Sequence, residues 1–410
     1  MSDPSRGPLA GVKVVELAHV MAGPVCGLML ADMGADVIKL ERVPGGDDSR
    51  DETKYAVDGE SASYMMVNRN KRSIAVDLKS AGGKDVLHRL LAGADAVIEN
   101  YRRGTMDRLG FGYEALHEAY PRLVYCSVSG FGRSGPYAER GGFDLIAQGM
   151  SGLMSYTGEG HGRPPVKCGA PVTDICAGIL GAMGVVAALY NRESTGRGQM
   201  VDTSLFEAGI TLSYWQSAMA FASGEVAQPL GSAHPLNAPY QAFETEDGWI
   251  TIGAANQGNW LRLVDVLGAP QLAEDPRFAD NTARMDNREA LEAELNAIFR
   301  QRTKADWLKR LEEAGVPAGP ILNVPEMHAD PQTLAREMVT EVTHSRLGPT
   351  KTLGLPVKFS EDPGGPRTGA PVYGEHTRAV LREHGFSEAE IDKLIREEAV
   401  IAAEATVPGQ

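Results

Sequence analysis

Cysteine, tryptophan and basic residues are all scarce in this sequence. It has four cysteines and four tryptophans among 410 residues, and aromatic residues make up 6%. The cysteines show no CxxC or other metal-binding spacing, which argues against a zinc or iron–sulfur site; they are Cys26, Cys126, Cys168 and Cys176. Asp and Glu outnumber Lys and Arg by 54 to 40, which gives a net charge of −14. Nucleic acid is therefore not an expected partner, because binding to its phosphates depends on a local or overall basic excess.

A long uncharged apolar run and a secretory leader are also missing. The first residues, MSDPSRGPLAG, are polar, and no stretch of about 18 or more uncharged apolar residues resembles a membrane span. We therefore expect a cytoplasmic protein that does not interact with a membrane. The remaining composition, 43% hydrophobic and 23% charged, is typical of a globular chain, and the length allows two or more domains.

The first half of the chain alternates between strand-like and helix-like segments. Apolar periodicity predicts strands at residues 12–17, 36–41, 73–77, 96–99 and 123–128, with helices at about 24–33 and 82–92 between them. This alternation predicts a parallel sheet in an α/β domain.

The sequence changes in character near residue 220. Gly, Pro and His residues at 231–239 precede a predicted hairpin of 240–243 and 249–252, and helices are predicted at about 260–267, 288–300 and 304–315. We predict a large α/β domain at 1–220 and a smaller α+β domain at 221–330. The segment 331–410, helical from about 377 to 403, is expected to return to the large domain.

One glycine-rich motif suggests a dinucleotide-binding site. Residues 130–135 (GFGRSG) match GxGxxG and follow a predicted strand. The chain then continues as a loop to Gly142, so no helix N-terminus faces a pyrophosphate at this point. A dinucleotide-dependent oxidoreductase is accordingly the disfavoured alternative.

Asp174 is a lone carboxylate at the start of the most apolar helix-like segment, whose residues 175–190 carry no charge. It fits two roles. Thr173 or Asp174 can be the N-cap of that helix, which spacing alone favours. Alternatively, the helix N-terminus keeps the Asp174 carboxylate ionised at pH 7, and nearby Gly169, Gly178 and Gly181 let a substrate approach so that the carboxylate attacks an activated acyl carbon.

Two further features bear on ligand binding. Basic residues gather at predicted strand ends, where they form either a solvated face or a site for the phosphates of a nucleotide-like ligand: Lys39, Arg42, Lys71, Arg72, Arg102, Arg103 and Arg108. A run of small and polar residues after a predicted strand is either a mobile lid over a substrate or an ordinary turn: Gly253, Ala254, Ala255, Asn256, Gln257 and Gly258. His19, His234 and His328 lack metal-ligand spacing, so no metal is expected.

Several segments together resemble the class III CoA-transferases, the family of formyl-CoA transferase and the carnitine CoA-transferases, which is related to the alpha-methylacyl-CoA racemases. The resemblance covers nearly the whole chain. The matching segments are PLAGVKVVEL at 8–17, HVMAGP at 19–24, GADVIKLE at 34–41, NKRSI at 70–74, ENYRRG at 99–104, RLG at 108–110, GFD at 142–144, PVTD at 171–174 and TGRGQ at 195–199.

The resemblance implies an open six-stranded, Rossmann-like sheet in a large domain built from both chain ends, and a homodimer of interlocked subunits. It implies that Asp174 is the catalytic residue. It also implies CoA contacts, carried over by position, at Val20, Met21, Ala22, Arg42, Val76, Asn100, Tyr101, Arg108 and Leu205.

The activity implied is CoA transfer from an acyl-CoA donor, with succinyl-CoA suggested by family frequency, to a free carboxylic or dicarboxylic acid. The reaction would pass through an aspartyl anhydride and an aspartyl-CoA thioester, with CoA as substrate and no permanently bound cofactor. A 2-methylacyl-CoA racemase or isomerase is the alternative on the same fold. The racemases, however, have a histidine where Phe143 stands, and phenylalanine cannot transfer a proton. Formyl-CoA transferase has a glutamine at Met21 and a longer glycine run than that at 253, so a larger and partly apolar acid is expected here in place of oxalate.

Overall fold

The chain folds into two compact units. The structure is a computed structural model that describes residues 7–403. The large unit contains the described residues up to Leu153, then Cys168–Ala218, then those from Pro331 onward. The smaller unit contains Met154–Lys167 and Met219–Asp330. The segment Met154–Lys167 thus lies in the smaller unit, whereas the sequence placed it in the large domain.

A seven-stranded sheet forms the centre of the large unit, in the order β12-β3-β2-β1-β4-β5-β6. Its strands are β1 Lys13–Leu17, β2 Asp36–Arg42, β3 Lys71–Val76, β4 Ala96–Glu99, β5 Val124–Ser129, β6 Met200–Ser204 and β12 Val400–Ile401. All neighbouring strands are parallel except β12, which pairs antiparallel with β3.

The expectation of six strands and of helix through residue 403 was therefore wrong at the C-terminal end. Helices α17 Thr377–Glu383 and α18 Glu388–Arg396 are separated by Gly385 at φ +81°, a backbone conformation that glycine readily adopts. After α18 the chain forms β12, whose β-branched residues suit a strand; Val400 pairs with Val76 and is 1% exposed.

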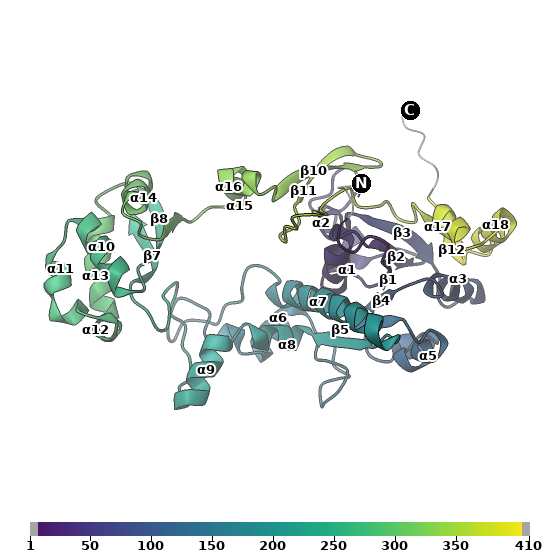
Figure 1. The fold of residues 1–410 in the computed structure, drawn as a ribbon, viewed down its shortest axis with the longest axis horizontal. Coiled ribbons are helices and arrows are strands. Elements are labelled where there is room, and N and C mark those ends of the chain that lie inside the picture. The colour runs from purple at the N-terminus through teal and green to yellow at the C-terminus, as the bar shows by residue number, and fades with distance from the viewer. Residues whose placement is uncertain (1–6, 404–410) are drawn as a thin grey trace. The chain divides into compact units, whose positions relative to one another are not determined.

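Helices cover both faces of the sheet, which is why its strands are apolar on both sides. Val14 and Val15, adjacent in β1, pack into different cores because successive strand residues point to opposite faces. The core on the Val15 side includes residues of α3 Ala81–Leu91, α17 and α18, so segments from the two halves of the chain meet there (Figure 1). The core on the Val14 side is closed by α1 Ala22–Asp32 and α7 Val172–Thr195, which contact each other along their lengths.

Helix α7 is long and apolar enough to cross a membrane, with 24 residues and a mean hydropathy of 2.0. Its uncharged run, residues 175–190, is shorter than the roughly 18 residues considered in the sequence analysis, and Asp174 precedes it. The structure shows a core helix instead: one side of α7 packs on α1, β5 and β6, where Ala177, Ala182 and Val185 are buried.

The smaller unit is a three-stranded antiparallel sheet covered by helices. Strands β7 Tyr240–Thr245 and β8 Gly248–Gly253 form the predicted hairpin, and β9 Ala318–Pro320 pairs with β8. Its core is aromatic, with Phe243, Trp260 and Phe299 almost fully buried. The helices that bury these rings include α10 Gln257–Leu267, α13 Arg288–Phe299 and α14 Lys304–Glu313.

The remaining elements are short and connect or flank these layers. They are α2 Ala62–Asn68, α4 Thr105–Leu109, α5 Tyr113–Ala119, α6 Asp144–Met150, α8 Leu205–Thr211, α9 Tyr214–Ser223, α11 Gln271–Glu274, α12 Asn281–Asp286, α15 Val324–Ala329, α16 Pro331–Ala335, the hairpin of β10 Val339–His344 and β11 Gly348–Leu353, and the 3₁₀ helices η1 Asp48–Asp51, η2 Leu153–Ser155 and η3 Pro276–Phe278.

Candidate active site

A cavity of about 370 Å³ opens in the large unit, where the loops after β1, β4 and β5 meet the N-terminus of α7. Ligands of open α/β sheets bind at this edge, outside the carboxyl ends of the strands. We call this cavity the Asp174 pocket. It is lined by His19, Val20, Met21, Ala22, Asp48, Asn100, Tyr101, Arg102, Arg103, Val128, Ser129, Gly130, Ala138, Arg140, Gly141, Gly142, Phe143, Asp174 and Leu205.

Asp174 is not the cap of its helix. The N-cap position of α7 is Pro171, which has no capping side chain, and the cap comes from α6 instead. Asp144 Oδ1 accepts hydrogen bonds from Thr173 N (3.0 Å) and Thr173 Oγ1 (2.8 Å). The Asp174 carboxylate makes no hydrogen bond or ion pair with the residues that the structure describes, so it is left available in the pocket. The capping alternative for Thr173 or Asp174 was therefore wrong.

Gln148, one turn along α6 from Asp144, holds the segment that leads into α7. Its side chain is buried; Nε2 donates to Asp144 Oδ2 at 2.7 Å, and Oε1 accepts from Cys168 N at 2.8 Å. Asp144 and Gln148 together fix both ends of the segment from Cys168 to Thr173. This network positions Asp174 although neither side chain bonds to it.

Burial, together with the smaller effect of the neighbouring Asp144 carboxylate, raises the pKa of Asp174 to about 7. A helix N-terminus favours the ionised form, but here burial outweighs it. The expectation of a fully ionised carboxylate at pH 7 was therefore wrong. Asp174 is partly protonated near neutral pH.

The glycines of α7 have a different role from the one expected. A Cβ atom on Gly178 would lie 2.6 Å from Ala22 O and 2.7 Å from Val25 Cβ, so glycine allows α1 and α7 to pack closely. Gly181 is similarly placed, 3.3 Å from Cys26 Sγ. These glycines therefore bring α1, whose first residues line the pocket, against α7 instead of opening space for a substrate.

The loop after β1 is held in an uncommon conformation. Val20 has φ +67°, which is costly for a β-branched residue and persists only when neighbours fix it. Here Val20 N donates to Asp47 Oδ1 at 3.0 Å. Asn100 makes paired bonds to the backbone of His19, accepting from its N at 2.9 Å and donating to its O at 2.8 Å. The conformation of the pocket wall at Val20 and Met21 is thus fixed by hydrogen bonds within the protein.

Two lysines that the sequence assigned to ligand phosphates are buried in an ion network instead. Lys39 Nζ lies 2.9 Å from Glu16 Oε1 and 2.8 Å from Asp47 Oδ2, and Lys71 Nζ lies 2.8 Å from Glu16 Oε2. Burial alone would lower the pKa of Lys39, but Glu16 and Asp47 outweigh it and hold that pKa above its ordinary value. Arg72 is likewise engaged, with Asp36 and Glu383. The two buried lysines therefore form neither a solvated face nor a phosphate site, the two alternatives that the sequence left open.

The other arginines lie in or near the pocket. Arg42 is exposed and pairs with Asp48, whose Oδ2 also lies 3.2 Å from His19 Nδ1. Arg103 pairs with Glu139 at 3.2 Å. Arg102 and Arg140 line the pocket, and the sequence gave no indication of Arg140 because it lies in a loop with no periodicity.

The positions carried over for CoA fall into two groups. The pocket is lined by Val20, Met21, Ala22, Asn100, Tyr101 and Leu205. Outside its lining lie Arg42, Arg108, which donates to Thr105 Oγ1, and Val76, whose side chain is 1% exposed in the apolar core. Phe143, 76% exposed, also lines the pocket.

The predicted lid at 253–258 is mostly regular structure of the smaller unit. Gly253 ends β8, Asn256 caps α10 by accepting from Asn259 N, and Gln257 and Gly258 belong to that helix. Only residues 254–256 lie between the two elements, as in the ordinary turn that was one of the two alternatives from the sequence.

The GxGxxG motif has no dinucleotide context. Gly132 and Gly135 adopt φ +86° and +81°, and α6, the next helix, begins only at Asp144. A Cβ on Gly130 would lie 2.7 Å from Gly142 Cα, so glycine there lets two pocket loops touch.

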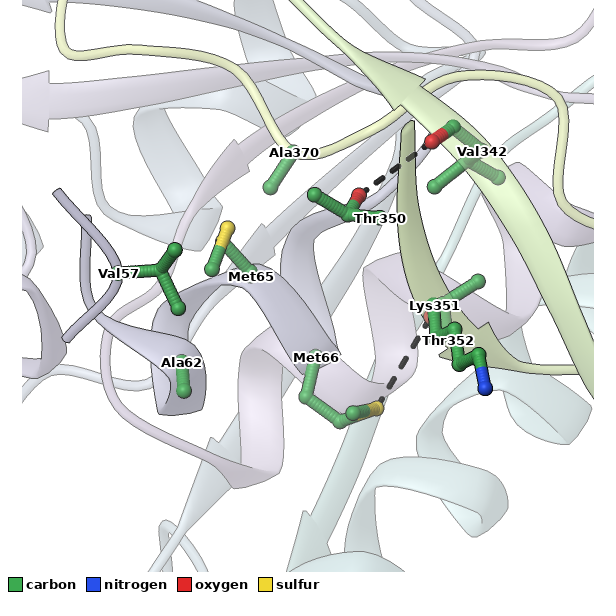
Figure 2. Close-up of a pocket in the computed structure, with 9 residues that line it drawn as sticks. All are labelled: Val57, Ala62, Met65, Met66, Val342, Thr350, Lys351, Thr352 and Ala370. Atoms are coloured by element: carbon green, nitrogen blue, oxygen red, sulfur yellow. Dashed lines mark hydrogen bonds between the residues drawn. The ribbon is translucent and has the colours of Figure 1, made fainter. Parts of the chain in front are cut away.

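A second cavity, of about 250 Å³, lies elsewhere in the large unit, between α2 and the β10–β11 hairpin (Figure 2). Its lining is mostly methyl groups and thioethers, including Met65, Met66 and Val342. Among the residues described, no group of three or more His, Cys, Asp or Glu is placed to hold a metal ion.

Comparisons with known proteins bear on this pocket. The chain matches the family model described as CoA-transferase family III over residues 9–377. It is 40% identical to the succinate–glutarate CoA-transferase of Agrobacterium fabrum over 92% of this chain and 96% of that protein. It is also 40% identical to the acetyl-CoA:oxalate CoA-transferase of Acetobacter aceti, over 94% and 97%. The crystal structure of a CAIB/BAIF family protein from Brucella suis matches with a TM-score of 0.83 at 41% identity, over 92% of this chain and 100% of that one.

Proposed function

Because the chain belongs to CoA-transferase family III, we propose that it moves CoA from an acyl-CoA donor to a free carboxylic acid, with Asp174 as the nucleophile. The observation that carries the proposal is an unpaired, largely buried carboxylate at the mouth of a helix, in a pocket at the carboxyl edge of a parallel sheet. A carboxylate attacks an activated acyl carbon without help from an adjacent base.

The Asp174 pocket supplies the contacts for the thioester end of CoA. Main-chain groups of Val20 to Ala22, with Asn100, Tyr101 and Leu205, form walls that accommodate an extended ligand. Arg42, at the end of β2, and Arg108, on α4, are exposed and supply positive charge for its phosphates, and Val76 contributes through its main chain at the end of β3. CoA enters as a substrate.

The reaction begins when an Asp174 carboxylate oxygen attacks the thioester carbonyl carbon of the donor. The carbon–sulfur bond breaks, which gives an aspartyl–acyl anhydride and CoA thiolate. The thiolate then attacks the Asp174 carbonyl carbon of the anhydride, releases the donor acid and leaves an aspartyl-CoA thioester. The acceptor carboxylate repeats the two steps in reverse, which regenerates Asp174 and forms the new acyl-CoA.

Two features of the pocket assist these steps. The N-terminus of α7, the positive end of the helix dipole, stabilises the negative charge that develops at the carbonyl oxygen. Burial of Asp174 limits access of water, which would otherwise hydrolyse the anhydride.

Trapping of the intermediate tests the mechanism. The protein is incubated with an acyl-CoA, quenched with hydroxylamine or borohydride, and the modified residue is mapped by mass spectrometry. Modification is expected at Asp174 alone, with no transfer by Asp174→Asn and full transfer by a control at an exposed aspartate of α10, Asp265→Asn. Modification at another residue, or full transfer activity of Asp174→Asn, would refute the mechanism. Deuterium exchange at the substrate α-carbon without an acceptor acid would instead indicate a racemase.

For the substrates, we propose a succinyl-CoA-type donor and a partly apolar dicarboxylic acceptor. The support is that the two relatives act by name on succinate, glutarate and oxalate, while apolar Met21 and Phe143 line this pocket. A panel of succinate, glutarate, mesaconate, malate, oxalate and carnitine, read by mass spectrometry of the CoA products, tests this choice; a preference for oxalate would contradict it.

We also propose that the chain works as a homodimer with interlocked subunits. In support, Met183 and Tyr190 on α7 are 62% and 83% exposed within one chain, and Ile179, Ile210 and Leu212 are exposed nearby in the fold. Apolar surface of this extent marks an interaction site. Light scattering is expected to give about twice the chain mass of 43.8 kDa; the chain mass itself, at micromolar concentration, would refute it.

A further inference from the structure

Two arginines of the Asp174 pocket have no acidic partner. Arg102 and Arg140 are exposed, and neither makes an ion pair with any residue within 7–403. The other two arginines in or near the pocket already have acidic partners, because Arg103 pairs with Glu139 and Arg42 pairs with Asp48. Two uncompensated cations therefore remain on the wall of a pocket in an otherwise acidic chain.

Both guanidinium groups are held in place by local contacts. The Arg140 guanidinium lies 4.1 Å from the centroid of the Tyr137 ring, a cation–π contact. The Arg102 guanidinium lies flat along Gly141, the residue after Arg140, since its Nη2, Cζ and Nε would all be 3.6–3.7 Å from a Cβ placed there. The two side chains thus belong to one region of the pocket wall, and like charges so gathered favour a bound anion.

The position of this region points to the reacting end of the ligand. Arg102 follows β4, and Arg140 lies in the loop after β5 that leads through the Gly130–Gly142 contact to Asp144, the cap of α7. Arg42, proposed for the CoA phosphates, follows β2, which is separated from β4 by β1.

We infer that Arg102 and Arg140 form an anion site that takes the second carboxylate of a dicarboxylic substrate while its first carboxylate reacts at Asp174. The inference rests on the proposed CoA transfer and names the residues that select diacids. The planar fork of arginine matches a carboxylate in bidentate fashion, so a monoacid of the same length loses these bonds.

Matched acceptors test the site. Glutarate and valerate differ in that a carboxylate replaces a terminal methyl group, and both are offered with the same succinyl-CoA donor, so an effect on the donor cancels in the ratio of their kcat/KM values. In Arg140→Met we expect this ratio to fall by about 10-fold or more, mainly through KM for glutarate, because a hydrogen-bonded charge contributes roughly 1.5–3 kcal/mol. Arg140→Lys keeps the positive charge but not the planar guanidinium, so its ratio should lie between those of the native protein and Arg140→Met.

Arg103→Met is the matched control, since Glu139 already balances that charge in the same pocket; its selectivity should stay that of the native protein. An unchanged ratio in Arg140→Met, or an equal fall in Arg103→Met, overturns the inference. If Arg140→Met instead weakens CoA binding in calorimetry with the ratio unchanged, the arginine serves a phosphate, which also overturns it. Absence of transfer to either acceptor by the native protein would refute the proposed function and is distinguishable from these results.

Discussion

Replacement of Asp174, the proposed nucleophile, should stabilise this protein. The pKa of Asp174 is raised from 3.8 to about 7, chiefly by burial. In the unfolded chain the group ionises at its ordinary pKa, so the unfolded state is favoured progressively as pH rises from 3.8 to about 7. A difference of about 3 pKa units corresponds to roughly 4 kcal/mol. Asp174→Asn, which carries no charge at any pH, removes that penalty.

The expected gain in free energy of unfolding for Asp174→Asn is therefore about 4 kcal/mol at pH 8, about 2 kcal/mol at pH 5, and close to zero below pH 3. Urea unfolding at these pH values, followed by circular dichroism, measures it. Asp265→Asn, at an exposed position, should show no such pH-dependent gain. Equal stability of the native chain and Asp174→Asn at pH 8 would refute the assignment of a costly buried carboxylate.

Three other substitutions test the surroundings of the site. Asp144→Asn keeps an acceptor for Thr173 but removes a neighbouring charge, so the pH–rate profile for formation of the covalent intermediate should move to lower pH; a profile that stays or moves up counts against the coupling. Lys39→Met leaves buried Glu16 and Asp47 unpaired, and urea unfolding should show a loss of about 3–5 kcal/mol; a loss below about 1 kcal/mol would show that the network is solvated. Gly178→Ala forces α1 from α7, with an expected loss of about 1–3 kcal/mol by urea unfolding and a higher KM for acyl-CoA; unchanged values would contradict the close contact.

The order of strands and helices in the large unit was predictable because apolar periodicity is local. The predicted strand at 96–99 coincides with β4, and the predicted helix at 82–92 differs from α3 by a residue. β12 was not predictable, because a two-residue strand after two helices has no periodicity of its own and forms only by pairing with β3.

The sequence identified Asp174 as a candidate but not what surrounds it. Lys39 and Lys71 resemble ligand-binding charges, and only the fold reveals that Glu16 and Asp47 already neutralise them. The cap by Asp144 joins residues far apart in sequence, so local rules assigned capping to the wrong side chains. The unpaired state of Arg140 is equally a property of the folded pocket.

The cap that α6 provides to α7 affects both the position of Asp174 and its pKa. Because Asp144 accepts the hydrogen bonds of Thr173, Asp174 is not needed as a cap. Because Asp144 is itself an anion, it also contributes to the raised pKa of Asp174. The position of Asp174 and its pKa therefore both depend on the side chain of Asp144. Asp144→Asn changes the charge alone, whereas Asp144→Leu, which removes both the charge and the acceptor for Thr173, should change the pKa of Asp174 and the start of α7 together.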